Sequence, residues 1–439
     1  MKVCKFGKIN DEDGVRRVVS CVLAERPYVA VLPVLAPLSD SLQKISVSWF
    51  HDEDSALYAA LDGLETYCRA FTAHVVTETG EAVKMMEHVE ERVANMRKMI
   101  ESKQDLLIDK LVKAEVYMLS AELMACCLRQ HGLNVKILDT ARFMQIDEER
   151  MFCISYVQET MRKYVGENRD AELLVAPLSM CKNAYGETDF ISDKRSDYYA
   201  AALAAILGAD ELILSTRLDN IYTNINSARE LHSLTYAEAG QLVSNESPLV
   251  YTDCITLAAR YNMAVRLTDV SDPDTERLYI SSRDTGNSVK AILAQDAVTF
   301  VRFTSRDVLP GYLILGKLLD VVERYKINVI SMSSSNVSVS MIVAASRDTL
   351  RIIRSELGKY VETLVSENMS AIHVIGSLNW ERTQLESEIM ETIRDVPVSF
   401  ISYGGSSHCF TVAVHSNDKK RILGLLSMLM RCGDTAKAQ

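Results

Sequence analysis

Glycine is scarce in this chain. Only 18 of its 439 residues are glycine, roughly 4% where about 7% is usual. Enzymes that wrap phosphate groups in loops place glycine there, because backbone N–H groups can then approach the anion closely. The shortage therefore argues against ordinary phosphate-handling catalysis.

Long apolar runs are also missing. The most apolar segment, residues 28–38, is interrupted by Pro33 and Pro37, and a membrane-spanning helix needs about 20 apolar residues. The opening MKVCKFGKIN contains no apolar signal-peptide core. We expect no membrane association and a cytoplasmic location.

Positive charge is in deficit, with 48 Lys and Arg against 59 Asp and Glu and a net charge of −11. A surface that coats nucleic acid needs the opposite excess, so we expect no nucleic-acid partner. The ten cysteines form no C-x-x-C pair and the eight histidines are dispersed. This spacing predicts reduced thiols and no metal site.

What the chain does contain is an alternation of strand and helix patterns. Residues 3–6 and 28–35 are typical of buried strands, and 11–24 carry valines at helical spacing. A helical signal runs over 52–129, and the alternation resumes after Gly132. The pattern predicts a three-layer α/β domain with a mainly parallel sheet over residues 1–285.

The last part of the chain has a different order of predicted strands and helices. A βαββαβ-like pattern occurs twice, at a repeat of roughly 70–75 residues. We expect two small α+β modules, at 286–360 and 361–439, interlaced through a strand at 289–304 that serves either one. A helix is expected at 347–364. Such a tandem behind a larger domain is typical of a regulatory tail.

Five motifs then stand in a fixed order along the chain. They are NAYGE at 183–187 with Ser196-Asp197-Tyr198, DNIYT at 219–223, LPGYL at 309–313, KINVISMSSSNVSVSM at 326–341, and AIHVIG at 371–376 with ISYGGSSHCFTV at 401–412. Together they resemble the motifs of the aspartokinases, which belong to the amino-acid kinase superfamily and carry tandem C-terminal ACT domains. The resemblance covers nearly the whole chain and implies the same α/β kinase fold followed by two ACT-like modules.

The phosphate loop that this resemblance implies is altered. The family opens with Lys-Phe-Gly-Gly-Thr-Ser, of which Lys5 and Gly7 remain with the phenylalanine between them. Lys8, Ile9 and Asn10 replace the second glycine and both hydroxyls. We expect Lys8 and Ile9 to obstruct the approach of the backbone to an anion, although Lys8 adds a positive charge.

The substrate side is altered too. The family's second loop keeps matching chemistry only at Ser39 and Asp40. The glutamate that helps hold the amino-acid substrate in the family falls on Tyr117. Glu115 lies two positions away, which on a helix turns its side chain by about 200°.

In the family's Arg-Gly-Gly-Ser-Asp motif, Asp193 replaces the arginine, and Lys194 and Arg195 replace the glycines. Ser196 and Asp197 are retained. An aspartate in place of the arginine reverses the charge where the resemblance implies a substrate carboxylate is clamped. Arg195 is a candidate to swing in as a substitute.

In the nucleotide segment, Arg217 and Ile225 stand at two acidic positions of the family, and Pro248 stands where the second ATP lysine is expected. Asp219 and Tyr222 match the family pattern. Since phosphoryl transfer depends on positioned cations, these losses predict weak catalysis.

The residual catalytic candidates are Lys5 and Asp197. Six positions are candidates for nucleotide or substrate binding: Gly7, Ser39, Asp40, Ser196, Asp219 and Tyr222. Structural alternatives stay open, since Lys5 could be a solvated surface lysine, Ser196 and Asp197 are also typical helix N-cap residues, and Asp219 with Asn220 is typical of a turn.

Candidate effector positions follow from the ACT-like motifs: Gly311, Tyr312, Ser334, Ser335 and Asn336. Lysine-responsive members place an aspartate where this chain has Ile330, and an apolar side chain cannot pair a buried ammonium, so lysine control is not expected. The alternative is that the strands of these modules bind no effector and only form a homodimer, in which the apolar segments 329–332 and 337–342 pair with another chain.

The leading hypothesis is an aspartokinase-family protein with a degenerate active site and little or no kinase activity, in a structural or regulatory role, with an active kinase as a possible partner. The alternative is a functional aspartate kinase that uses Mg–ATP in lysine, threonine and methionine biosynthesis. A third reading is another small-molecule kinase or sensor with a remodelled pocket.

Overall fold

A computed structural model describes residues 1–102, 107–167, 170–215, 221–222, 233–241, 250, 252–268, 278–283, 289–306, 311–378 and 383–432. The chain divides into two compact units. The first comprises Met1–Thr216 and Val250–Ser282, and the second comprises Arg217–Leu249 and Arg283–Gln439. The domain boundaries expected at 285 and 360 stay predictions.

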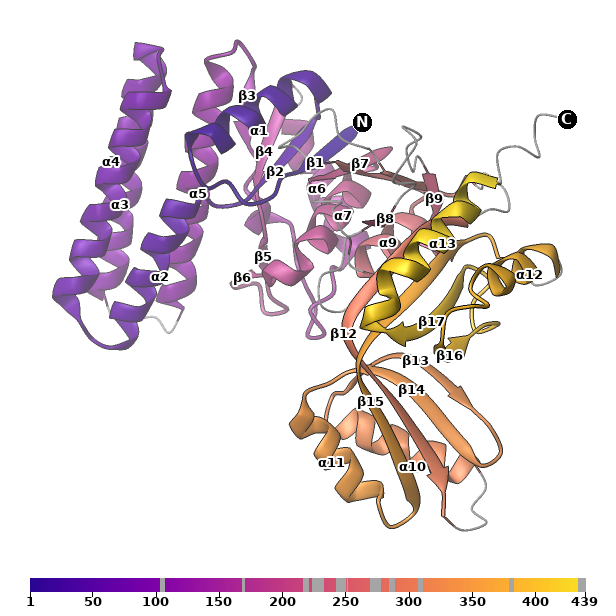
Figure 1. Cartoon of the computed structure of the whole chain (residues 1–439). Helices are drawn as coiled ribbons and strands as arrows, with labels where there is room; N and C mark the ends of the chain where they lie inside the picture. The colour runs from indigo at the N-terminus through magenta and orange to yellow at the C-terminus, as the bar shows by residue number, and fades with distance from the viewer. Residues whose placement is uncertain are drawn as a thin grey trace, which may run out of the picture. The chain divides into compact units, whose positions relative to one another are not determined.

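The first unit is built on a mainly parallel sheet (Figure 1). Its strands follow the spatial order β3 (Val135–Ile137), β4 (Leu173–Pro177), β2 (Val29–Leu32), β1 (Lys2–Lys5), β7 (Glu211–Ser215), β10 (Ala264–Thr268) and β11 (Leu278–Ser281). All of these pairings are parallel except β10 with β11. The predicted α/β fold with a mainly parallel sheet is confirmed.

Helices cover both faces of this sheet. The helices of the unit are α1 (Glu12–Glu25), α2 (Ala36–Phe50), α3 (Asp54–Val75), α4 (Thr79–Ser102), α5 (Ile108–Arg129), α6 (Ile154–Glu167), α7 (Ser196–Leu207) and α9 (Thr252–Arg260). Helices α1 to α5 share one core with Cys4 of β1 and Val175 of β4. The alternate residues Val3 and Leu174 are equally buried, and α7 packs against β1 and β7, so the other face is covered as well.

The helical signal expected over 52–129 is three helices, α3, α4 and α5, and together with α2 they form the elongated lobe seen in Figure 1. Helical spacing of Val83, Met86, Val89, Val93, Met96 and Ile100 predicts one buried face over 83–100. The last four of these side chains are buried in α4, but Val83 is exposed and Met85 rather than Met86 completes the buried face. Burial rather than ligand binding therefore accounts for these side chains.

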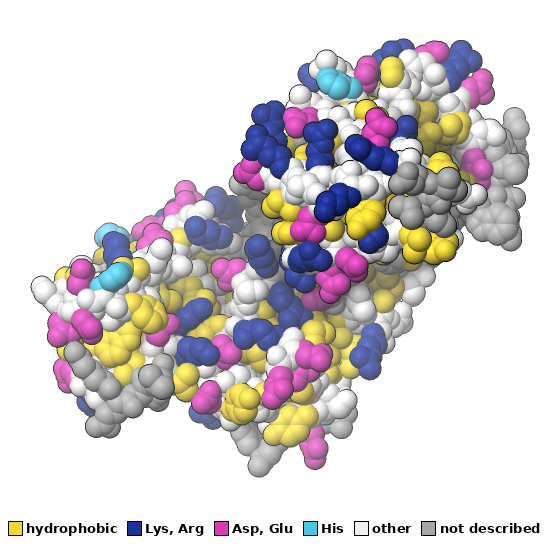
Figure 2. Space-filling view, turned by 90° about the horizontal axis from the view of Figure 1, so that it is seen from below, with side chains coloured by type: hydrophobic (Ala, Val, Ile, Leu, Met, Phe, Trp, Pro, Cys, Tyr) yellow, Lys and Arg dark blue, Asp and Glu magenta, His cyan; other side chains and the backbone are white. Residues whose placement is uncertain are grey.

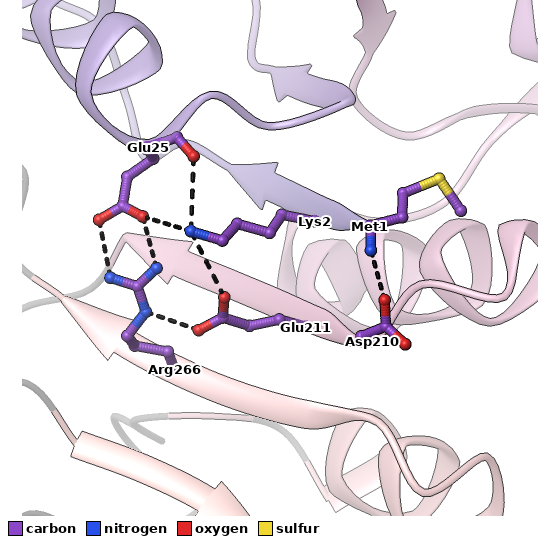
Figure 3. Close-up of polar contacts among 6 residues, drawn as sticks. All are labelled: Met1, Lys2, Glu25, Asp210, Glu211 and Arg266. Carbon is purple, nitrogen blue, oxygen red and sulfur yellow. Dashed lines mark hydrogen bonds and ion pairs between the residues drawn. The ribbon is translucent and has the colours of Figure 1, made fainter.

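An ionic cluster ties four elements of the first unit together (Figure 3). Arg266, which is only 3% exposed, donates to both carboxylate oxygens of Glu25 at 2.7 and 2.6 Å and to Glu211 at 2.8 Å. Lys2 completes the cluster by donating to Glu25 at 3.3 Å. Two carboxylates around a buried guanidinium satisfy its charge, as a buried ion requires.

The second unit contains an antiparallel sheet built around two long strands, β12 (Val289–Ser305) and β15 (Val361–Gly376), which pair along most of their length. The order is β13 (Asn328–Ser334), β14 (Ser338–Ala344), β12, β15, β17 (Cys409–His415) and β16 (Val398–Ser402), and the short β8 (Ile221–Tyr222) pairs with β12. The strand expected at 289–304 therefore continues through both halves of the sheet.

Each half of that sheet has its own helices and core. Helices α10 (Gly311–Arg324) and α11 (Arg347–Leu357) cover one half, where Phe303 and Met341 are buried. Helices α12 (Thr383–Thr392) and α13 (Lys419–Cys432) cover the other, where Ile372 and Phe410 are buried. Short elements β9 (Ser233–Thr235) and α8 (Tyr236–Gln241) complete the described part of this unit. The predicted pair of α+β modules is thus present as two halves of one sheet.

Positive and negative side chains are interspersed over the face of the molecule in Figure 2, and its apolar side chains form scattered patches. Within the described ranges, no helix combines the length and hydropathy of a membrane-spanning segment. The same residues contain no group of three or more His, Cys, Asp or Glu side chains placed to hold a metal ion.

Candidate active site

The first unit contains a cavity of about 350 Å³ at the carboxyl ends of β1, β2 and β4. Carboxyl ends of parallel strands are where α/β sheets bind their ligands. The lining residues come from the loops after these strands and from the 3₁₀ turn and helices beside them: Lys5, Phe6, Gly7, Lys8, Pro33, Val34, Ser39, Tyr117, Leu178, Ser179, Asp193 and Ser196. Four of the predicted site residues, Lys5, Gly7, Ser39 and Ser196, therefore meet at one place.

Lys5 and Asp197 form an ion pair at this cavity. The Lys5 Nζ donates to Asp197 Oδ1 at 2.8 Å, and each side chain is only 12% exposed. Lys5 ends β1, and Asp197 lies in the first turn of α7. The reading of Lys5 as a solvated surface lysine is therefore wrong. The interpretation of Ser196 and Asp197 as N-cap residues is wrong, because the N-cap of α7 is Arg195 and both residues lie inside the first turn. The carboxylate of Asp197 pairs with Lys5 and lies near the positive end of the helix dipole.

The loop after Gly7 differs from the sequence expectation at Ile9. Its side chain is 1% exposed and belongs to the core of the first unit, so it does not obstruct the cavity. The Ile9 carbonyl accepts the N–H of Ala36 at 2.9 Å, which fixes the loop against the start of α2. Lys8, which is exposed, is the substituted residue that lines the cavity.

Tyr117 forms the wall where the resemblance implies a substrate-binding glutamate. Its ring packs against Phe190 with 4.9 Å between centroids, and burial raises the pKa of Tyr117 to about 12. Glu115 is engaged elsewhere, because Arg92 donates to it at 2.6 Å. The position of the family's carboxylate is thus occupied by a neutral phenol.

Asp193 lines the cavity, but a cation stands close to it. The Lys113 ammonium lies 4.3 Å from the centroid of Phe190 and 5.5 Å from that of Tyr117. Burial lowers the pKa of Lys113, while the negative charge of Asp193 opposes that shift. Sequence reasoning missed Lys113, although its position four residues before Tyr117 places both on one face of α5.

Arg195 does not replace the missing arginine. It forms an ion pair with Asp253 at 3.0 Å, lies over the ring of Tyr198 at 4.5 Å, and donates to the carbonyl of Arg150 at 2.8 Å. These contacts hold it away from the cavity lining, so the idea that it swings in is not supported by its position.

Ser179 is a second residue that sequence reasoning missed. It follows β4 in a turn with φ of +73°, a conformation that non-glycine residues rarely adopt. The side chain is 1% exposed, and within the described residues its hydroxyl has no hydrogen-bond partner. The sequence offers no signal for it, since no glycine or asparagine marks the turn.

Some predicted residues lie apart from the cavity or outside the described residues. Asp40 is exposed on α2 and does not line the cavity. Asp219 lies outside the described residues, as do Arg217, Ile225 and Pro248. Tyr222 is described only by its backbone, which pairs with Ile292 in the second unit.

No predicted effector residue lines either of the two cavities found among the residues that the structure describes. Tyr312 is 71% exposed in the first turn of α10, which begins at Gly311, and Ser334, Ser335 and Asn336 are exposed at the turn between β13 and β14. A separate cavity of about 330 Å³ in the second unit contains none of them.

The lining of that second cavity carries no Lys, Arg, Asp or Glu. It includes Ile330 at the position where lysine-responsive relatives place an aspartate. It also includes His373, whose Nδ1 lies 2.9 Å from the Thr411 hydroxyl and whose pKa burial lowers to about 4. A neutral lining does not favour a ligand with a charged side chain.

The comparisons with known proteins agree with this architecture. The Amino acid kinase family profile matches residues 60–269. Lysine-sensitive aspartokinase 3 of Escherichia coli is 22% identical over 250 residues, which cover 54% of this chain and 56% of that protein. The chloroplastic aspartokinase 3 of Arabidopsis thaliana is 26% identical over 259 residues, covering 55% and 46%. The chain thus spans about half the length of the curated relatives it matches.

Solved structures extend the likeness of the fold to nearly the whole chain. The aspartate kinase of Clostridium acetobutylicum superposes with a TM-score of 0.79 at 14% identity, covering 98% of this chain and 100% of that one. E. coli aspartokinase III in complex with lysine and aspartate superposes with a TM-score of 0.77 at 19% identity, covering 98% and 99%.

Proposed function

Because this chain belongs to the amino acid kinase family and resembles the aspartokinases within it, we propose that it is an aspartokinase-family protein whose active site has degenerated, so that it has little or no aspartate kinase activity and a structural or regulatory role. The observation that carries the proposal is the substrate end of the cavity, where Tyr117 and Asp193 stand in place of the family's glutamate and arginine.

The chemistry of phosphoryl transfer explains why this change matters. An acyl-phosphate-forming kinase has to hold an anionic substrate and the γ-phosphate of ATP together, and it does so with positioned cations and dipoles. In this cavity, the charge of Lys5 is already matched by Asp197 at 2.8 Å. Lys8 is exposed, and Asp193 would repel the carboxylate of an aspartate substrate.

The residues present fit the phosphate end of Mg–ATP better than its amino-acid partner. Lys5, Lys8, Gly7 and the hydroxyls of Ser39 and Ser196 are the groups that would contact phosphate oxygens. Asp193 is the carboxylate of the lining that a Mg²⁺ ion could use, since Asp197 is engaged with Lys5. Mg–ATP binding is thus compatible with the lining, whereas an aspartate clamp is not.

The second candidate is a functional aspartate kinase, which converts ATP and L-aspartate to 4-phospho-L-aspartate and ADP. The specific observation in its favour is Lys113, a half-buried cation whose pKa is lowered by burial and raised by the negative charge of Asp193, and whose own charge offsets that carboxylate. In that case the lysine, approaching from α5, would take over part of the role of the absent arginine.

A steady-state coupled assay separates the two. Purified protein with Mg–ATP and L-aspartate is expected to release no ADP above the rate without aspartate, and Asp193→Arg is expected not to restore turnover because Tyr117 remains. Aspartate-dependent turnover at or above roughly 1 s⁻¹, which is within the usual enzyme range, would favour the functional kinase. Lys113→Ala is then the matched variant, since it should abolish that turnover.

We also propose that the antiparallel unit mediates a homodimer. Strand β13 lies at one end of its sheet, while β14 is paired on both sides by β13 and β12. Of the two predicted segments, residues 329–332 of β13 are therefore at an edge that a second copy could pair with, whereas residues 337–342 are not. An amino-acid effector, an active kinase partner and a cytoplasmic location remain predictions.

A further inference from the structure

The turn at Ser179 is held in place from two sides. The N–H of Leu178 donates to the carbonyl of Leu32 at 2.8 Å, and the carbonyl of Ser179 accepts the N–H of Ile191 at 2.9 Å. These bonds connect the end of β4 to β2 and to the residue that follows β6 (Thr188–Phe190). The surrounding backbone therefore imposes the positive φ of +73° on a residue that has a Cβ.

Serine is an unfavourable choice for this turn on structural grounds. The third position of a turn with positive φ favours glycine or asparagine, because a Cβ is crowded there. Burying a hydroxyl without a partner adds a second cost. Both costs fall on Ser179, whose side chain is 1% exposed and whose hydroxyl makes no hydrogen bond to any described residue.

The surroundings of Ser179 indicate what its hydroxyl would meet. It lines the cavity of the first unit together with Lys5, Lys8, Ser39 and Ser196. These residues and Ser179 together supply two ammonium groups and three hydroxyls, all of which can donate hydrogen bonds. Ser196 is also the first residue of α7, and the N-terminus of a helix carries a partial positive charge.

The only carboxylate among the residues that line this cavity is that of Asp193, and Lys113 lies close enough to oppose its charge. Lys5 is itself paired with Asp197, so Lys5, Lys8 and Lys113 stand against two carboxylates. The remaining positive charge favours an oxyanion over a cation or an apolar group.

We infer that Ser179 is a ligand-binding residue, which donates its hydroxyl proton to an oxyanion of the molecule that occupies this cavity, either a phosphate or a carboxylate. This inference rests on the family role proposed for the cavity but requires no turnover. The bound oxyanion would supply the missing partner of the buried hydroxyl, and it would account for a serine at a strained position.

The test is a binding titration on the full chain. Inorganic phosphate, Mg–ADP, Mg–ATP and L-aspartate are titrated separately into wild-type protein by calorimetry. Binding of any of the first three indicates that the cavity accepts a phosphate, and binding of L-aspartate indicates that it accepts a carboxylate. Each ligand that binds is then titrated into Ser179→Ala, Ser179→Gly and Ser192→Ala. The last is the matched control, because Ser192 is exposed, makes no side-chain capping bond and does not line the cavity.

We expect at least one of the four ligands to bind the wild type and to bind both Ser179 variants about ten- to a hundredfold more weakly, as loss of a hydrogen bond to a charged acceptor implies. Ser192→Ala should bind like the wild type. Ser179→Gly should also raise the thermal midpoint of the first unit by about 2–4 °C, since it relieves the backbone strain. A variant that binds more weakly while being more stable cannot be explained by misfolding.

Two results would overturn the inference: none of the four ligands binds the wild type, or both Ser179 variants bind as tightly as the wild type. Neither result refutes the proposed loss of activity, since the first is compatible with an inactive site and the second concerns the Ser179 hydroxyl alone. Conversely, aspartate turnover by the wild type would refute the proposed function, and the binding constants of the Ser179 variants would still decide the role of the hydroxyl.

Discussion

Replacing Glu25 with glutamine should destabilise the first unit in a way that depends on pH. Glu25 accepts two hydrogen bonds from Arg266, at 2.7 and 2.6 Å, and one from Lys2 at 3.3 Å (Figure 3). The bonded guanidinium lowers the pKa of Glu25 from an ordinary 4.5 to about 2. In the folded protein the carboxylate therefore holds its proton far more weakly than in the unfolded chain.

The sign of the pH effect follows from this shift. Because the folded pKa lies below the unfolded one, the contribution is complete above pH 4.5 and is lost as the pH falls towards 2. Each pKa unit is worth about 1.4 kcal/mol, so the shift corresponds to at most about 3 kcal/mol. Glu25 keeps 16% of its side-chain surface exposed, and solvent screening reduces the expected loss in Glu25→Gln to about 2–3 kcal/mol at pH 7.

Urea unfolding followed by tryptophan fluorescence measures this loss. The chain has two tryptophans, so a Trp380→Phe background leaves Trp49 of α2 to report on the first unit. The difference between wild type and Glu25→Gln should shrink from pH 5 to pH 2. Glu87→Gln, an exposed substitution on α4, is the control and should leave the free energy of unfolding unchanged. Equal stability of Glu25→Gln and wild type at pH 7, or a difference that does not change with pH, would refute the reasoning.

Two further substitutions address the second unit. Burial lowers the pKa of His373 from 6.5 to about 4, so the free energy of unfolding of the second unit should fall by up to about 3 kcal/mol as the pH falls from 6.5 to 4. His373→Gln should remove that part of the pH dependence in urea unfolding, and an unchanged pH profile would contradict the prediction. Glu238 is fully buried, pairs with Lys290 at 2.8 Å and accepts the N–H of Thr235 at 2.7 Å. Glu238→Gln should therefore lower the free energy of unfolding by about 3 kcal/mol. The control is Glu388→Gln on the surface, which should leave the free energy of unfolding unchanged.

The sequence predicted the elements of the fold better than their ends. The alternation of buried strands and amphipathic helices was sufficient for the parallel sheet, because each pattern has its own period. The helix predicted over 347–364 is wrong beyond Leu357, where α11 ends before Gly358, and Val361 begins the long strand β15. A Cβ at Gly358 would lie 2.6 Å from the carbonyl oxygen of Arg354, one helical turn earlier, and periodicity does not reveal this local crowding of the backbone.

Sequence motifs predicted individual residues of the candidate site, but not the contacts between residues that are far apart in the chain. Lys5 and Asp197 were both identified, but their ion pair joins residues 192 positions apart, and no local pattern predicts such a contact. Lys113 lies one helical turn before Tyr117 on α5 but belongs to no motif, and Ile9 turns into the core instead of the cavity. Charge compensation and side-chain direction depend on packing between elements, so sequence reasoning overstated the obstruction and missed the nearby cation.

The most direct test of the account is a single-turnover measurement that detects the product itself. The protein, in excess over Mg–ATP labelled in its γ-phosphate, is incubated with L-aspartate and hydroxylamine, which converts an aspartyl acyl phosphate to a stable hydroxamate. The account predicts no aspartyl hydroxamate above the level of a Lys5→Ala control, even at long incubation. Hydroxamate that accumulates with the loss of labelled ATP, and that disappears in Lys5→Ala, would contradict the claim that this site has lost aspartate kinase activity.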